Sequence, residues 1–175
     1  MLTNLWYHLS HLPTLDQKYI NEAHSSDYTY KSNLVAAHSR KYYAVQAESQ
    51  FANTKFCNDL SKEFGELGPV KYSRNDPYTL YEWHVDSGRS CSINFALSEL
   101  PNAFTLFRAP INNAIFSIDE CKYPIYRPVL FNSTVPHCVI NNSNQPRYIL
   151  SVTFPKLVTF DDARQFLVNY HTDKY

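Results

Sequence analysis

The sequence has little glycine, no closely spaced cysteines and no long apolar run, and each of these absences excludes a class of protein. Only three of the 175 residues are glycine, namely Gly65, Gly68 and Gly88. Neither glycine-rich phosphate-binding pattern, G-x-x-x-x-G-K-[ST] or G-x-G-x-x-G, can therefore be written along the chain. No stretch approaches the roughly 18 apolar residues that a membrane-spanning helix needs, so we expect no membrane association.

The four cysteines, Cys57, Cys91, Cys121 and Cys138, lie far apart in the sequence. Without a C-x-x-C pair, neither a zinc knuckle nor a thioredoxin-like redox site is predicted. The segment Met1–Pro13 lacks the basic and apolar regions of a signal peptide. We therefore expect free thiols and a cytoplasmic protein, located in the host cytoplasm if its source is viral.

The charges are balanced, because 16 lysines and arginines stand against 16 aspartates and glutamates. A net charge of zero provides no long-range attraction to nucleic acid or to anionic lipid, so neither partner is expected. The 14 tyrosines favour a β-rich chain and argue against disorder. A chain of this length can bury about two-thirds of its unfolded surface, so it needs no disulfides.

We predict a single domain over residues 1–175, made of three segments. Residues 1–68 would form a support of helices and loops, residues 69–155 a jelly-roll core, and residues 156–175 a C-terminal helix. Near residue 68, helical spacing of apolar residues gives way to short runs of β-branched and aromatic residues. The predicted fold class is therefore mainly β with flanking helices.

The core segment contains eight candidate strands, separated by turns rich in Asn, Asp, Pro and Ser. Eight short strands are the number in a jelly roll, the cupin-like double-stranded β-helix in which two antiparallel sheets form a barrel. The strands are predicted at Val70–Arg74, Tyr78–Asp86, Ser90–Leu97, Phe104–Arg108, Ala114–Ile118, Val129–Asn132, Pro136–Asn141 and Arg147–Phe154. Helices are predicted from a Thr14 capping box to about His24, over Thr54–Phe64 and over Phe160–Tyr170.

A His-x-Asp pair, His84 and Asp86, stands near the end of one candidate strand. Residues i and i+2 of a strand point to the same face, so an imidazole nitrogen and a carboxylate oxygen reach one point. With a further histidine, such a pair forms the 2-His-1-carboxylate site of non-haem Fe(II) enzymes. The pattern also arises by chance, and we interpret a second copy, His171-Thr172-Asp173 in the polar tail, as incidental.

Two later residues make the first pair more specific. His137 follows it by three or four strands, which is the separation at which a jelly roll brings a late strand beside an early one. Taken alone, His137 is more often a core histidine that bonds the backbone. Arg147 begins an apolar strand, where a guanidinium is costly unless it meets an anion such as a carboxylate. An arginine that reaches solvent from the strand end would give the same pattern.

Read in order, these residues form His-x-Asp, a long gap, His, and then Arg on the next strand. Here the sequence resembles the Fe(II)/2-oxoglutarate-dependent oxygenases, most of all the prolyl-4-hydroxylase-like branch and its small phage-type members, over about residues 70–155. The resemblance implies that His84, Asp86 and His137 bind Fe(II), that Arg147 binds the co-substrate 2-oxoglutarate, and that O2 reacts there. The implied reaction is hydroxylation of a C–H bond in a peptidyl, amino-acid or small-molecule substrate, with release of succinate and CO2.

The resemblance also predicts a hydroxyl that assists the arginine, often two residues after it. This sequence has Ile149 at that position, so Ser151 or Tyr78 would have to replace the hydroxyl. Asn94 lies on an otherwise apolar strand. A buried amide needs partners, so Asn94 would bond the co-substrate, orient a metal ligand, or satisfy a neighbouring backbone group.

Two neighbours of the pair are expected to lie outside the site, Tyr81 packed behind it and Arg89 solvated in the following turn.

Two other functions stay open: a cupin-type metal- or ligand-binding protein that is not an oxygenase, and a catalytically inactive jelly-roll module. The chain lacks the His-x-His of many cupins, and its complete ligand set argues against an inactive module. The segment Ser25–Tyr43 would be a lid or an interface, and nothing in the sequence decides the oligomeric state.

Overall fold

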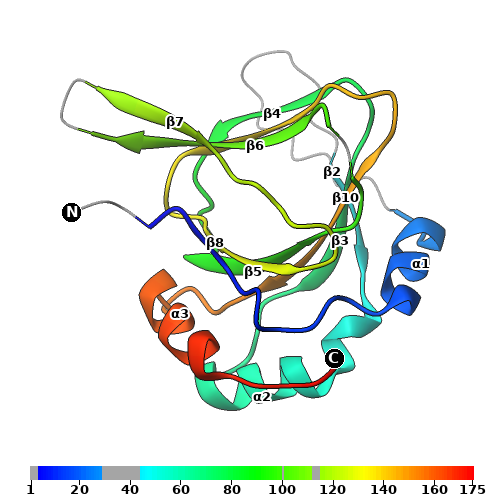
Figure 1. Ribbon diagram of the computed structural model, residues 1–175, viewed down its shortest axis with the longest axis vertical. Coiled ribbons are helices and arrows are strands. Elements are labelled where there is room, and N and C mark those ends of the chain that lie inside the picture. Colours follow the sequence, from blue (N-terminus) through cyan, green and yellow to red (C-terminus); the bar gives the residue numbers. More distant parts are fainter. Residues whose placement is uncertain (1–3, 29–43, 100, 112–114) are drawn as a thin grey trace.

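The structure is a computed structural model that describes residues 4–28, 44–99, 101–111 and 115–175 (Figure 1). Over these ranges the chain forms two sheets whose neighbouring strands are antiparallel. The first sheet has the strand order β1-β8-β5-β10-β3-β2, and the second has the order β4-β9-β6-β7. Most of the segment Ser25–Tyr43, predicted to be a lid or an interface, lies outside the described residues.

Strands β3 to β10 correspond to the eight predicted strands. Consecutive strands alternate between the two sheets, except that β6 and β7 form a hairpin within the second sheet. Two antiparallel sheets connected in this way are a double-stranded β-helix, so the predicted fold class is confirmed. The strands are β3 Val70–Asn75, β4 Thr79–His84, β5 Cys91–Ala96, β6 Ala103–Pro110, β7 Phe116–Glu120, β8 Pro128–Asn132, β9 His137–Asn141 and β10 Arg147–Thr153.

Two strands of the N-terminal third extend the first sheet at its edges. The strand β1 (Trp6–His8) pairs with β8, and β2 (Ala44–Glu48) pairs with β3. The prediction of only helices and loops over residues 1–68 was therefore incomplete. Short edge strands form by pairing with a strand already in place, and this pairing leaves little signal in the local sequence.

Within the described residues, three α-helices lie along the outer face of the first sheet (Figure 1). One hydrophobic cluster joins them to it, with Ile20, Leu60 and Leu167 from the helices and Ile93 and Leu150 from the strands. In the part of the chain that the structure describes, every helix is too short and too polar to cross a lipid bilayer. The helices are α1 Gln17–Ser25, α2 Lys55–Phe64 and α3 Phe160–Asn169, and a 3₁₀ turn, η1 Gln50–Asn53, precedes α2.

The helix ends follow ordinary capping rules, with one correction to the prediction. The helix α1 is capped by Asp16, whose side chain accepts from the backbone N–H of Lys18, and not by Thr14. The helix α2 ends at Gly65, which adopts a φ of 85° that a residue with a Cβ rarely takes. Thr159 caps α3 as predicted and forms a reciprocal capping box with Asp162.

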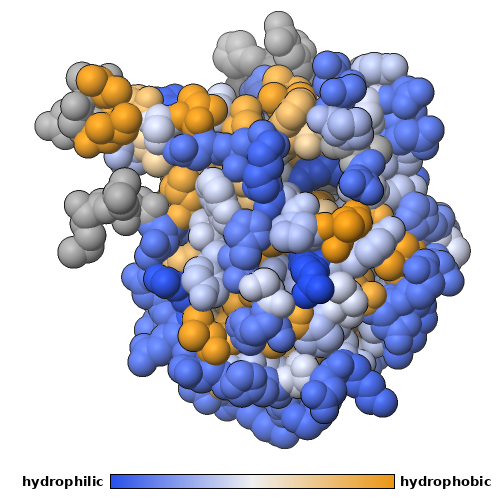
Figure 2. All heavy atoms as spheres, in the orientation of Figure 1, coloured by the Kyte–Doolittle hydropathy of each residue, from blue (hydrophilic) through white to orange (hydrophobic). Residues whose placement is uncertain are grey.

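The second sheet carries no helix on its outer face within the described residues. Its hairpin, β6–β7, reaches away from the rest of the molecule (Figure 1), and Figure 2 shows apolar side chains gathered at its end. Among them Ile111, Ile115 and Phe116 are exposed. The larger apolar core lies between the helices and the first sheet. A smaller apolar cluster, which includes Phe107 of the second sheet and Phe131 of the first, lies between the two sheets.

The four cysteines are buried free thiols, as predicted. Burial raises the pKa of Cys57 to about 11 and that of Cys91 and of Cys121 to about 12. These thiols are therefore protonated near neutral pH, which makes them poor nucleophiles and poor metal ligands.

Candidate metal-binding site

A cavity of about 410 Å³ lies between the two sheets, and polar side chains form much of its wall. All three predicted metal ligands line it, together with Arg147, Asn94 and Ser151. Tyr78 does not. It lies in the turn before β4 with a φ of 55°, its side chain is 71% exposed, and it is absent from the cavity wall. The prediction that Tyr78 assists 2-oxoglutarate binding was therefore wrong.

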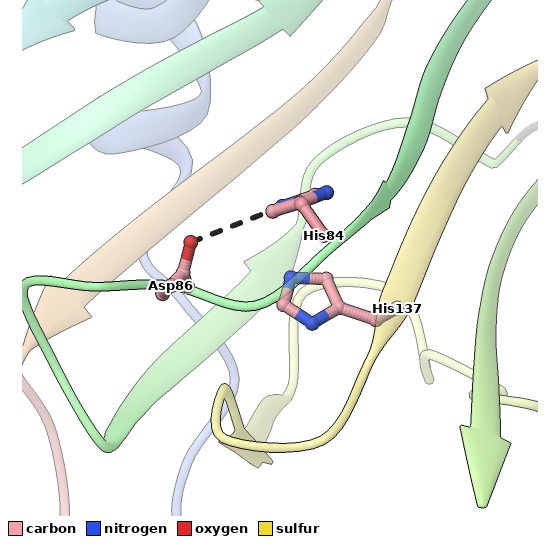
Figure 3. A group of neighbouring side chains, drawn as sticks. All are labelled: His84, Asp86 and His137. Atoms are coloured by element: carbon pink, nitrogen blue, oxygen red, sulfur yellow. Dashed lines mark ion pairs between the residues drawn. The ribbon is translucent and has the colours of Figure 1, made fainter.

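The structure brings His84, Asp86 and His137 together at one side of this cavity (Figure 3). One possible ligand atom from each residue lies within 4.8 Å of those of the other two. His84 ends β4 and is the cross-strand partner of His137, which begins β9. Their ring centroids are 4.2 Å apart, and Nε2 of His84 lies 3.8 Å from Oδ1 of Asp86. Two imidazoles and one carboxylate can thus reach a single ion.

The hydrogen bonds of both histidines leave Nε2 available as a metal ligand. Nδ1 of His84 lies 2.7 Å from the carbonyl of Glu82, and Nδ1 of His137 lies 2.8 Å from that of Val135. A carbonyl only accepts, so each Nδ1 carries the hydrogen and each Nε2 keeps its lone pair. Burial lowers the pKa of His137 to about 4 and also lowers the pKa of His84. Both rings are therefore neutral near pH 7, which is the form that binds metal.

An irregularity in β4 places Tyr81 on the site. The register between β4 and β9 shifts between Tyr81 and His84, as in a β-bulge, which changes the alternation of side chains. The ring of Tyr81 lies 4.0 Å from that of His84, centroid to centroid, and lines the cavity. The expectation that Tyr81 packs behind the site was wrong, because regular alternation does not continue through the bulge.

Arg89 also belongs to the site, contrary to the prediction of a solvated turn residue. Its Nε donates to Oδ2 of Asp86 at 2.7 Å, and its Nη1 donates to Oγ1 of Thr153 at 3.2 Å. The turn after β4 thus folds back over the cavity and connects the second sheet to β10 of the first.

Arg147 lies deep in the cavity wall and is only 6% exposed, which excludes an arginine that reaches solvent. Its Nη2 donates to Oγ1 of Thr105 at 2.8 Å, and its guanidinium carbon lies 5.7 Å from the ring centroid of Tyr123. No ion pair within the described ranges includes Arg147. Burial lowers the pKa of Arg147 from a very high ordinary value. A buried charge is costly unless it is paired, so Arg147 is a candidate for binding an anion.

The remaining predicted helpers form a network of side chains. Oδ1 of Asn94 accepts from Oγ of Ser92 at 3.1 Å and from Oγ of Ser151 at 2.8 Å, and its Nδ2 donates to the hydroxyl of Tyr123 at 3.4 Å. Among the described residues, the side chain of Asn94 thus bonds other side chains and not the backbone. Ser151 donates to Asn94, whereas the hydroxyl that contacts Arg147 belongs to Thr105. Sequence reasoning missed Thr105 and Tyr123, which lie on other parts of the chain.

No protein-family model and no curated protein matches this sequence. Solved structures do match. The structure of AviO1 from Streptomyces viridochromogenes has a TM-score of 0.56 at 11% identity, over 89% of this chain and 91% of that chain. The non-heme alpha ketoglutarate dependent epimerase SnoN, from nogalamycin biosynthesis, has a TM-score of 0.53 at 12% identity, over 97% and 86%.

A third match is a Burkholderia pseudomallei oxidoreductase of the 2OG-Fe(II) oxygenase family, with a TM-score of 0.44 at 10% identity. The match covers 52% of this chain and 45% of that chain, so this chain spans less than half of its length. The first two matches show that the chain shares the fold of AviO1 and of SnoN, in agreement with the double-stranded β-helix described above.

Proposed function

We propose that the protein is an Fe(II)- and 2-oxoglutarate-dependent dioxygenase that hydroxylates a C–H bond of a peptidyl, amino-acid or small-molecule substrate. One observation carries the proposal: a single cavity holds both the triad of metal ligands and a buried arginine with no ion-pair partner in the described part of the chain. A co-substrate with a metal-binding end and a carboxylate end needs both features. SnoN, which shares the fold, is an alpha ketoglutarate dependent enzyme by name.

The residues present fit Fe(II). His84, Asp86 and His137 would hold the ion with two neutral imidazoles and one carboxylate, a donor set typical of non-haem Fe(II) with open positions. Bound Fe(II), together with 2-oxoglutarate and O2, supplies the oxidation of the C–H bond and releases succinate and CO2. The chain contributes fixed imidazole orientations, set by the carbonyls of Glu82 and Val135.

Arg147 would bind the 2-oxoglutarate carboxylate that lies far from the iron. Its partner Thr105 stands two residues along β6 from Phe107, which is the cross-strand neighbour of His137. Two residues of a strand span roughly 7 Å, which is the length scale of a five-carbon diacid. Thr105 holds the guanidinium in place before the ligand arrives, so little ordering remains to be done when the carboxylate binds.

The size of the cavity and the net charge of the chain support the proposed substrate class. A cavity of about 410 Å³ is at the small end of ligand pockets, which range over roughly 300–1,000 Å³. With a net charge of zero, this favours a small molecule or one peptidyl side chain over nucleic acid. The buried free thiols support a place in the cytoplasm.

The test is spectroscopic. Fe(II) and then 2-oxoglutarate are added to metal-free protein without oxygen, and the visible iron-to-oxo-acid charge-transfer band is recorded. We expect the band in the wild type and its loss in His137→Ala. In Arg147→Ala the 2-oxoglutarate concentration that gives the half-maximal band should rise at least roughly 30-fold. Loss of one partner of a buried charge pair costs about 2 kcal/mol or more.

The control is His171→Ala, which removes the histidine of the other His-x-Asp pair and does not touch the cavity wall. It should keep the wild-type band. A wild type that gives no band, and that binds zinc tightly without any effect of 2-oxoglutarate, would overturn the proposal in favour of a cupin-type binding protein.

A further inference from the structure

We propose that Arg89 is a positioning residue that occupies one carboxylate oxygen of Asp86 and so makes Asp86 a one-oxygen metal ligand. The inference rests on the proposed metal site but assigns a role to a residue outside the ligand triad. It begins with the short contact in which Nε of Arg89 donates to Oδ2 of Asp86 at 2.7 Å. A charge-assisted bond of this length is among the strong hydrogen bonds of proteins.

The two oxygens of the Asp86 carboxylate have different surroundings. Oδ1 lies 3.8 Å from Nε2 of His84, on the side where the two imidazoles meet. Oδ2 is held by Arg89. The carboxylate therefore presents one oxygen to the metal position while the guanidinium holds the other.

The number of oxygens matters because a carboxylate can bind a cation with one oxygen or with both. Around a six-coordinate ion, two imidazoles and one oxygen would leave three positions open. An oxo acid that binds with two atoms would fill two of them, and one would remain for O2. A second oxygen from Asp86 would take that last position. The ion pair with Arg89 holds this oxygen and would so keep the position open for O2.

Arg89 is itself held from two directions. Its Nη1 donates to Oγ1 of Thr153 on β10, and its carbonyl accepts from Oγ of Ser133 at 3.2 Å. Ser133 is fully buried, lies in the turn that leads to His137, and accepts the backbone N–H of Asp86 at 3.2 Å. The turn with Asp86 and Arg89 is thus fixed both to the first sheet and to the segment before the third ligand.

The pair also differs from a freely solvated ion pair, since the side chains of Arg89 and Asp86 are 28% and 18% exposed. A contact on an open surface would constrain the carboxylate little. Here Thr153 holds the partly buried guanidinium on the first sheet, and Ser133 holds the backbone carbonyl of Arg89.

The test uses Co(II) in place of iron, because its visible bands depend on the number and symmetry of its ligands. Arg89→Gln should change these bands and weaken Co(II) binding by about 10-fold, since partners of metal ligands typically contribute 10–100-fold. Arg89→Lys, which keeps a cation and a donor, should recover both properties in part. Thr153→Val keeps Arg89 but removes one anchor, so it should give an intermediate change with an intact fold.

Arg108→Gln is the matched control, because Arg108 is exposed on β6 with its guanidinium over the ring of Phe116, outside the cavity. It should leave Co(II) binding unchanged. Unaltered Co(II) bands and affinity in Arg89→Gln would overturn the inference. The inference would also fail if Arg89→Gln raised only the 2-oxoglutarate concentration required for binding and left the Co(II) bands and affinity unchanged. If the wild type binds no Co(II), the proposed function fails as well. If the wild type binds both Co(II) and 2-oxoglutarate and Arg89→Gln has no effect, only the inference about Arg89 fails.

Discussion

Replacing Arg147 with methionine separates a binding role of this arginine from a structural role. The guanidinium is buried, and its described contacts are one hydrogen bond to Thr105 and the ring of Tyr123. Exchanging buried ionic groups for apolar side chains of similar volume often stabilises a protein by about 1–4 kcal/mol. Leaving the Thr105 hydroxyl without its donor costs about 1–3 kcal/mol. The two effects largely cancel, so Arg147→Met should change the free energy of unfolding by less than about 2 kcal/mol.

The double variant Arg147→Met/Thr105→Val removes the unsatisfied hydroxyl. It should be more stable than Arg147→Met by about 1 kcal/mol, as measured by urea unfolding of the metal-free protein. Thermal melting of the metal-loaded protein provides the second measurement. A ligand at 100 times its Kd stabilises by about 2.7 kcal/mol, which raises the Tm of a domain of this size by roughly 5–10 °C. Wild type should show this rise with 2-oxoglutarate, and Arg147→Met should not.

A structural arginine predicts the opposite pattern. Removing one partner of a buried ion pair typically costs about 3–5 kcal/mol, because the other partner is left uncompensated. A loss of more than about 3 kcal/mol in Arg147→Met would refute the view that this cation awaits an external anion. A rise in Tm with 2-oxoglutarate equal to that of the wild type would refute it as well.

Three further outcomes are expected. Thr105→Val should raise the 2-oxoglutarate concentration needed for the half-maximal charge-transfer band about 10-fold, because a hydrogen bond to a charged group contributes about 1.5 kcal/mol. Because burial holds the pKa of His137 at about 4 in the folded state, the unfolded chain takes up the proton first as the pH falls. The free energy of unfolding of the metal-free protein should therefore not depend on His137 above about pH 6.5, and it should fall by up to about 3 kcal/mol towards pH 4. Urea unfolding of His137→Gln over the same pH range should show a smaller loss. Thr159→Ala removes the cap of α3 and should lower the free energy of unfolding by about 1 kcal/mol, measured in urea at neutral pH.

The core of the fold was predictable because its signals are local. Each of the eight core strands is a short run of β-branched and aromatic residues between turn residues, so its existence can be read without knowing its partner. Strand ends are set by partners instead. The strand predicted at Ala114–Ile118 is observed as β7, Phe116–Glu120, where the residues of β6 opposite it fix the register. The edge strand β2 escaped prediction for the same reason, because it exists by pairing with β3.

The same distinction explains which parts of the site were found. The triad and Arg147 stand at strand ends in a fixed order along the chain, so sequence order was enough to propose them. Thr105 reaches Arg147 from the opposite sheet, across the cavity, and only the packing of the two sheets brings these residues together. Reasoning along one strand proposed Ser151 as the assisting hydroxyl, because Ser151 shares a face with Arg147. In the folded chain Ser151 bonds Asn94, and residues of both sheets form the proposed anion site around Arg147.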